Sequence, residues 1–166
     1  MFYRFYPDKY MDSAYLIDFA AYYKAGYRGI IFDVDNTLVP HGSPADEKAI
    51  ALFQYLKELG MEAILLSNNK EPRVKQFHES VQVPYIFKAN KPSVRNYRKA
   101  MEHMGTTSQN TIFVGDQLFT DIWGANKANI YTILVKPIHP KEEFQIVLKR
   151  YLEKVVLFFY KRHRNP

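Results

Sequence analysis

Short apolar runs that each end in polar residues recur along this chain, and they limit how it can fold. The runs cover residues 30–32, 63–66 and 111–114, and the next polar residues are Asp33, Ser67 and Asp116. Stretches with helical periodicity lie between them. This alternation is typical of a parallel α/β sheet, whose ligands bind where the strands' carboxyl ends meet. We therefore expect the residues that follow the runs to gather in one pocket.

The fold that we expect is a single-domain, doubly wound, mainly parallel α/β sheet of five strands with helices on both faces. A length of 166 residues, 47% hydrophobic content and only 7 Gly favour one globular domain, 1–166. The expected strands are 29–32, 61–66, 85–87, 111–114 and 131–135. The expected helices are 10–25, 45–59, 71–79, 92–104, 117–128 and 140–162. We distinguish an aromatic N-terminal segment, 1–26, and a basic amphipathic C-terminal helix, 140–162.

Two acids stand one residue apart at the end of the first run, in the sequence Phe-Asp-Val-Asp-Asn-Thr-Leu-Val. Alternate side chains of an extended backbone share a face, so Asp33 and Asp35 would point the same way. Two carboxylates this close repel each other unless a cation lies near them. An ordinary acidic turn would have a similar sequence, so the remaining motifs decide between the two interpretations.

Those motifs follow in order: Leu-Ser-Asn-Asn at 66–69, Lys-Pro at 91–92, and Gly-Asp-Gln-Leu-Phe-Thr-Asp at 115–121. With the first motif they resemble the four motifs of the haloacid dehalogenase (HAD) superfamily. Within it the chain is similar to the YqeG-like, class IIIA phosphatases, which are related to mitochondrial phosphatidylglycerophosphate phosphatase. The resemblance covers residues 10–140. The stretches 39–44 and 88–90 are too short for a cap domain, so we expect none.

The resemblance implies a role for each motif residue. Asp33 would attack phosphorus and carry an aspartyl-phosphate, and Asp35 would protonate the leaving oxygen and then activate water. Lys91 would neutralise the transferring phosphate. The side chains implied to bind substrate are Thr37, Ser67 and Asn68. In the plainer interpretation, Ser67 and Asn68 cap a helix and Lys91 is a surface lysine.

The resemblance also implies Mg²⁺ as the cofactor, a cation that prefers oxygen ligands. Its implied ligands are Asp33, the backbone carbonyl of Asp35, and Asp116. Asp121 would lie behind them and orient the lysine or a water. Alternatively, Asp116 and Asp121 are acids of a turn and of a helix N-terminus. An Asp at position 35 favours phosphate chemistry over carbon–halogen cleavage.

The implied substrate is phosphatidylglycerophosphate, an anionic phospholipid. An open, capless site suits phosphates on large objects, and a net charge of +6 favours anionic partners. Other phosphoesters remain open as substrates: a phosphoprotein, a nucleotide or a sugar phosphate. In an alternative of another class, the chain is a basic RNA- or ribosome-binding module on a HAD fold. No recognised nucleic-acid motif supports that alternative, and nucleic acid is not expected as a partner.

The C-terminal helix bears on location. It carries an apolar stripe surrounded by basic residues; the stripe is Phe144, Val147, Leu148, Tyr151, Leu152, Val155, Phe158 and Phe159. We favour packing of this stripe on the sheet, and the alternative is a helix that lies in a membrane interface. With no Cys, no signal-peptide core and no transmembrane segment, we expect a cytoplasmic protein. Any contact with the membrane would be peripheral, on its inner face.

Overall fold

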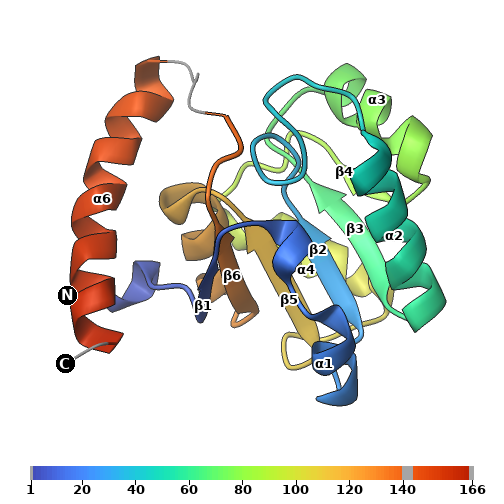
Figure 1. The fold of residues 1–166 in the computed structure, drawn as a ribbon, viewed down its shortest axis with the longest axis horizontal. Coiled ribbons are helices and arrows are strands. Elements are labelled where there is room, and N and C mark those ends of the chain that lie inside the picture. Colours follow the sequence, from blue (N-terminus) through green and yellow to red (C-terminus); the bar gives the residue numbers. More distant parts are fainter. Residues whose placement is uncertain (1, 140–143, 165–166) are drawn as a thin grey trace.

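The computed structural model, which describes residues 2–139 and 144–164, contains a six-stranded parallel sheet in the order β1-β6-β5-β2-β3-β4 (Figure 1). Its strands are β1 (Lys9–Met11), β2 (Gly29–Phe32), β3 (Glu62–Leu66), β4 (Tyr85–Ile86), β5 (Thr111–Gly115) and β6 (Tyr131–Val135). The parallel α/β class is confirmed, and the expected number of strands is one too low.

The additional strand is β1, which pairs with β6 through Lys9↔Ile133 and Met11↔Val135. The expected helix over residues 10–25 is wrong in its first half. That segment contains β1, the 3₁₀ turn η2 (Ala14–Leu16) and a short helix, α1 (Phe19–Lys24). The Asp18 side chain accepts a hydrogen bond from the Ala21 N–H and begins α1 there. Aromatic residues at helical spacing hid a strand of only three residues.

The other helices lie close to their expected positions. They are α2 (Glu47–Leu59), α3 (Glu71–Val81), α4 (Val94–Met104), α5 (Trp123–Lys127) and α6 (Phe144–Arg164), and a 3₁₀ turn, η1 (Tyr3–Phe5), precedes β1. Residues 140–143 of the expected C-terminal helix lie outside the described residues. The expected helix over 117–128 is instead a π-helical turn, η3 (Leu118–Ile122), followed by α5.

Every residue of β2 is buried because helices cover both faces of the sheet. Ile30 and Phe32 point into a core with α1, α2 and α3, whereas Ile31 points into a second core with α4 and α5. The two cores therefore follow the alternation of side chains along the strand. This double burial fixes the register, since a slip by one residue would exchange the two faces.

The strand order reverses between β2 and β5. From β2 the chain builds β3 and β4 toward one edge, then returns to the other side of β2 to form β5 and β6. β2 and β5 pair in register through Ile30↔Ile112, so their carboxyl ends lie together. Ligands of open α/β sheets bind in the crevice at this kind of reversal.

The α6 helix lies beside η1 at the β1 side of the molecule, apart from the helices that cover the sheet (Figure 1). Its buried side chains are Glu153, Val156 and Tyr160, and Val156 packs in a small cluster with Leu118 and Leu134. The favoured interpretation, in which the predicted stripe packs on the sheet, is wrong. A different face is docked, and most of the stripe is exposed: Leu148, Tyr151, Leu152, Val155, Phe158 and Phe159.

Among the described residues, no helix combines the length and the apolar character that a membrane crossing requires. The α6 helix has 21 residues but carries several charges along its length.

Candidate active site

A cavity of about 250 Å³ lies at the carboxyl ends of β2 and β3. Five of the predicted site residues line it: Asp33, Asp35, Ser67, Asn68 and Lys91. Ile146 and Lys149 of α6 also line the cavity. A larger cavity of about 460 Å³ lies between α2, β3 and the end of α3 and contains none of the motif residues.

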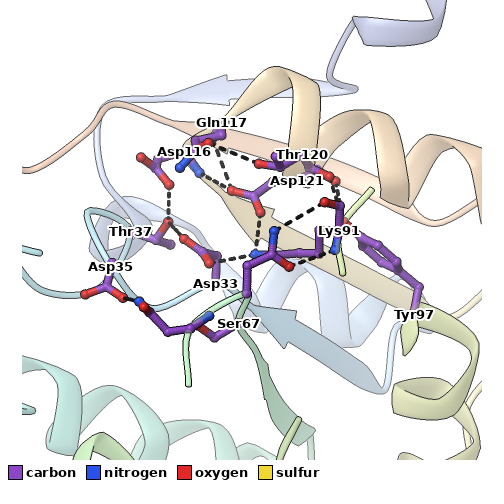
Figure 2. Close-up of polar contacts among 12 residues, drawn as sticks. Asp33, Asp35, Thr37, Ser67, Lys91, Tyr97, Asp116, Gln117, Thr120 and Asp121 are labelled. Atoms are coloured by element: carbon purple, nitrogen blue, oxygen red, sulfur yellow. Dashed lines mark hydrogen bonds and ion pairs between the residues drawn. The ribbon is translucent and has the colours of Figure 1, made fainter. Parts of the chain in front are cut away.

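A buried lysine joins two carboxylates on the floor of the site. The Lys91 Nζ donates to Asp33 Oδ1 at 2.7 Å and to Asp121 Oδ1 at 2.6 Å (Figure 2). All three side chains are at least nine-tenths buried. The structure therefore brings together residues from three segments that are far apart in the sequence.

Burial and charge act in opposite directions on this group. Burial raises the pKa of Asp33 to about 6, helped by the nearby Asp121 carboxylate and opposed by Lys91. Burial alone would lower the pKa of Lys91, but the carboxylates of Asp121 and Asp33 outweigh it and raise that pKa above its usual value. Lys91 is therefore a permanent cation in the pH range of cells.

Asp116 lies beside Asp33 and brings a third carboxylate to the site. The Thr37 hydroxyl lies between them, 3.2 Å from Asp33 Oδ2 and 3.1 Å from Asp116 Oδ1 (Figure 2). Burial, together with repulsion from Asp33 and Asp121, raises the pKa of Asp116 well above its usual value, against the opposing effect of Arg150. Thr37 is buried and is not among the described residues that line the cavity.

Asp35 is held at the cavity wall, away from this cluster. Its Oδ1 accepts from the Gly42 N–H at 2.8 Å and from Arg73 Nη2 at 2.9 Å, and its Oδ2 accepts from Asn69 Nδ2 at 2.7 Å. Burial alone would raise the pKa of Asp35, but the Gly42 N–H and the Arg73 guanidinium outweigh it and lower that pKa. Asp35 is therefore ionised in this arrangement.

The residues after β3 hold the loop that carries Lys91 in place through hydrogen bonds. The Asn68 side chain accepts from the Lys91 N–H at 2.7 Å and donates to the Lys91 carbonyl oxygen at 3.2 Å. Both ends of the Asn68 amide therefore bind the backbone of Lys91. The Ser67 hydroxyl oxygen accepts from the Asn69 N–H at 3.1 Å.

The turn between β5 and η3 places Asp121. Its Oδ2 accepts from the Asp116 N–H at 3.2 Å and from the Gln117 N–H at 3.1 Å. Because these contacts and Lys91 use both oxygens, Asp121 is fully engaged. The wider π-helical turn, with the Ile122 N–H donating to the Gln117 carbonyl, brings it there. A Cβ on Gly115 would lie 2.6 Å from Asp121 Oδ2, so this position requires glycine.

Sequence reasoning missed the contribution of α6. Arg150 Nη1 donates to the Asp116 carbonyl oxygen at 2.6 Å, and Nη2 donates to Asp116 Oδ2. Glu153 accepts from Arg150 at 3.0 Å and from the Leu118 N–H at 2.9 Å. A basic residue in an amphipathic helix has no local signal for such a contact. Arg73 had only a weak signal, its position four residues after Asn69.

The donor set fits a hard divalent cation. One oxygen each from Asp33, Asp116 and Asp121 lies within 4.8 Å of the other two, and all three residues are buried. Buried carboxylates with raised pKa values are stabilised by a cation that neutralises them, and Mg²⁺ prefers oxygen ligands. Asp33 Oδ2 and Asp116 Oδ1 share the Thr37 hydroxyl, which can donate to only one of them at a time, so these two oxygens are freer for a cation than those of Asp121.

Comparison with known proteins places the chain among HAD-type phosphatases. A HAD-hydrolase-like family model matches residues 88–137. The chain is 35% identical over 159 residues to the probable phosphatase YqeG of Bacillus subtilis. This match covers 95% of this chain and 92% of that protein. It is 29% identical over 149 residues to the chloroplastic phosphatidylglycerophosphate phosphatase 1 of Chlamydomonas reinhardtii, covering 83% of this chain and 55% of that protein.

The fold itself has solved counterparts. A HAD-superfamily hydrolase from Ehrlichia chaffeensis matches with a TM-score of 0.55 and 15% identity, over 77% of this chain and 97% of that chain. At this identity the likeness concerns the fold alone. The extended match to YqeG is what decides the family: this chain belongs to the YqeG family of HAD-type phosphatases.

Proposed function

We propose that the protein is a Mg²⁺-dependent phosphomonoester hydrolase that works through an aspartyl-phosphate on Asp33. One observation carries this proposal: Asp33 opens onto the cavity while Lys91 binds its Oδ1 at 2.7 Å and Asp116 lies beside it. A carboxylate so placed can attack a phosphorus atom in line with the leaving oxygen. The bond from Asp33 to phosphorus forms as the bond to the leaving alkoxide breaks.

Asp35 is the group that would move the proton. It would protonate the leaving alkoxide in the first step and then, as a carboxylate, take a proton from the water that attacks the phosphoenzyme. The contacts with Arg73 and Gly42 hold it ionised, which suits the second step. The first step requires that substrate binding weaken the contact with Arg73, because only a protonated Asp35 can act as the acid.

The remaining residues would manage charge. Mg²⁺, held by Asp33, the backbone carbonyl of Asp35 and Asp116, would neutralise the phosphate oxygens. Lys91 would neutralise the phosphate from the other side and keep Asp33 oriented, and Asp121 would hold Lys91 in place. Ser67 and Asn68 line the cavity where the phosphoryl oxygens would lie, and Thr37 would support both carboxylates.

The substrate that we propose is phosphatidylglycerophosphate, converted to phosphatidylglycerol at a membrane surface. The likeness to a relative named for that activity supports it. A cavity of about 250 Å³ accommodates a phosphate and a glycerol group but not acyl chains, so the rest of such a lipid would remain outside. The positive net charge of +6 favours an anionic lipid surface.

A phosphate-release assay tests this proposal. Phosphatidylglycerophosphate is compared with a sugar phosphate, a nucleotide and a phosphopeptide at equal concentration, with Mg²⁺ and with EDTA. We expect Mg²⁺-dependent release that is fastest on the lipid. A preference for a soluble phosphate would overturn the lipid assignment and retain the phosphatase. Absence of release from every substrate, combined with tight RNA binding, would instead favour the binding-module alternative.

A further inference from the structure

An exposed apolar stripe runs along the outer side of α6. Its members recur at helical spacing and are each 44–63% exposed: Leu148, Tyr151, Leu152, Val155, Phe158 and Phe159. From the first to the last is about 17 Å at about 1.5 Å per residue. Large apolar side chains gathered along one face mark an interaction surface, whereas scattered ones do not.

The orientation of this stripe is fixed by the opposite side of the helix. Glu153 accepts from the Leu118 N–H, Arg150 donates to Asp116, and Val156 and Tyr160 are buried. The α6 helix is therefore anchored to η3, and rotation to bury the stripe would break these contacts. The stripe must face outward in the folded chain.

The charges beside the stripe indicate its occupant. Lys149, Lys154, Lys161 and Arg162 are exposed, and the one acid in the α6 sequence, Glu153, is buried. A second copy of the chain would bring two sets of cations together with no exposed acid on either helix to pair with them. An anionic lipid surface supplies both an apolar layer and negative charge.

We propose that α6 is the element by which the protein docks on anionic bilayers, with the stripe inserted among the lipids and the lysines at the headgroups. This inference deepens the proposed function and rests on it, because a lipid substrate is the reason for the protein to bind a bilayer. Because Ile146 and Lys149 of the same helix line the cavity, docking of α6 would hold the cavity close to the bilayer surface.

Vesicle sedimentation of the full chain tests the docking. The probes are phosphatidylcholine vesicles with and without phosphatidylglycerol, at low and high salt. The apolar variant is Leu152→Glu with Phe158→Glu, and its matched control is Ile50→Glu with Tyr55→Glu, two exposed apolar residues of α2. The basic variant is Lys154→Glu with Lys161→Glu, and its control is Lys48→Glu with Lys57→Glu.

We expect the wild type to bind only the vesicles that contain phosphatidylglycerol, and less tightly in high salt. Both α6 variants should bind at least about tenfold more weakly, and both α2 controls should bind like the wild type. All five proteins should hydrolyse a soluble phosphate ester equally, which shows that they are folded. Unchanged vesicle binding by the apolar variant would overturn the proposal. So would a wild type that ignores vesicles but forms a dimer that this variant dissociates.

An assay with a short-chain, water-soluble phosphatidylglycerophosphate distinguishes failure of the docking proposal from failure of the substrate proposal. Its hydrolysis by a protein that does not bind vesicles would sink the docking and leave the proposed function intact. Vesicle binding through α6 without hydrolysis of this ester would sink the substrate and leave the docking.

Discussion

At the scale of single residues, the site is a cluster of buried acids whose charges are only partly compensated. Three carboxylates, those of Asp33, Asp116 and Asp121, share the cations Lys91 and Arg150. Burial, followed by repulsion between the carboxylates, raises the pKa values of Asp33 and Asp116. Substitutions that neutralise one of these charges should therefore have separate, measurable effects.

The nucleophile assignment predicts that Asp33→Asn abolishes turnover, because an amide does not attack phosphorus. We expect Asp35→Asn to be slower by roughly 10²–10⁴-fold, the usual contribution of a positioned acid–base group. Steady-state phosphate release measures both, and circular dichroism checks the fold. Wild-type turnover by folded, metal-loaded Asp33→Asn protein would refute the assignment.

Asp33 should also leave a signature in stability against pH. Its pKa is about 6 in the folded protein against about 3.8 as a free side chain, so the folded state binds the proton more tightly. Its contribution to stability is therefore complete below about pH 4 and is lost as the pH rises through 6. In EDTA, the unfolding free energy of wild type should fall relative to Asp33→Asn by up to roughly 3 kcal/mol across this window. Urea curves whose difference does not change with pH would contradict this.

Asp116 should link metal binding to stability, because its charge is unfavourable in the metal-free protein and is needed to hold the cation. Asp116→Asn keeps hydrogen-bonding groups toward Thr37 and Arg150 but removes a charge that repels Asp33 and Asp121. The metal-free variant should be more stable by roughly 1 kcal/mol, and its activity should require more Mg²⁺. Thermal unfolding in EDTA and a Mg²⁺ titration of activity measure the two effects. An unchanged Mg²⁺ requirement would remove Asp116 from the proposed ligands.

At the scale of elements, the sequence was most informative where a strand is buried on both faces. Each of β2, β3 and β5 contains an apolar run that ends at a motif, so both the strands and the order of the motifs could be read directly. The strand β1 has only three residues and carries no such run. The π-helical turn η3 depends on contacts from the Asp121 side chain, which a helical periodicity does not reveal.

The α6 helix was recognised as amphipathic, but the face that docks could not be predicted. Periodicity indicates the larger apolar stripe, whereas the docked face is fixed by polar contacts of Arg150 and Glu153 with the β5–η3 turn. Such long-range contacts depend on where the helix lies, which the sequence pattern does not give. Arg150 is therefore a residue of the site rather than a cation available to lipid.

This contact predicts a specific loss in Arg150→Met. The variant leaves the Asp116 carboxylate and Glu153 without their guanidinium, so stability should fall by roughly 2 kcal/mol and the Mg²⁺ dependence of activity should shift. Lys154→Met, at an exposed position of the same helix, is the matched control and should change neither. Chemical denaturation and a Mg²⁺ titration provide the comparison. If both variants behave alike, the contact has no role in the site.

At the scale of the whole molecule, the reversal of strand order between β2 and β5 gathers the motifs into one site. Asp33 follows β2, Ser67 follows β3 and Asp116 follows β5, although more than 80 residues separate the first from the last. The α6 helix then closes one side of the cavity with Ile146 and Lys149, in a chain without room for a cap between its motifs. The same helix presents its apolar stripe outward.

Trapping the phosphoenzyme would show whether the phosphoryl group passes through Asp33. The Asp35→Asn protein is mixed with Mg²⁺ and an aryl phosphate, whose leaving group needs no acid, and is quenched in acid. It should accumulate the intermediate, because the water that would hydrolyse the phosphoenzyme lacks its base. Mass spectrometry of the digested protein locates the added group. We expect one phosphoryl group on Asp33, and none when EDTA replaces Mg²⁺. A phosphoryl group on another residue, or turnover with no phosphorylated protein at any time, would contradict it.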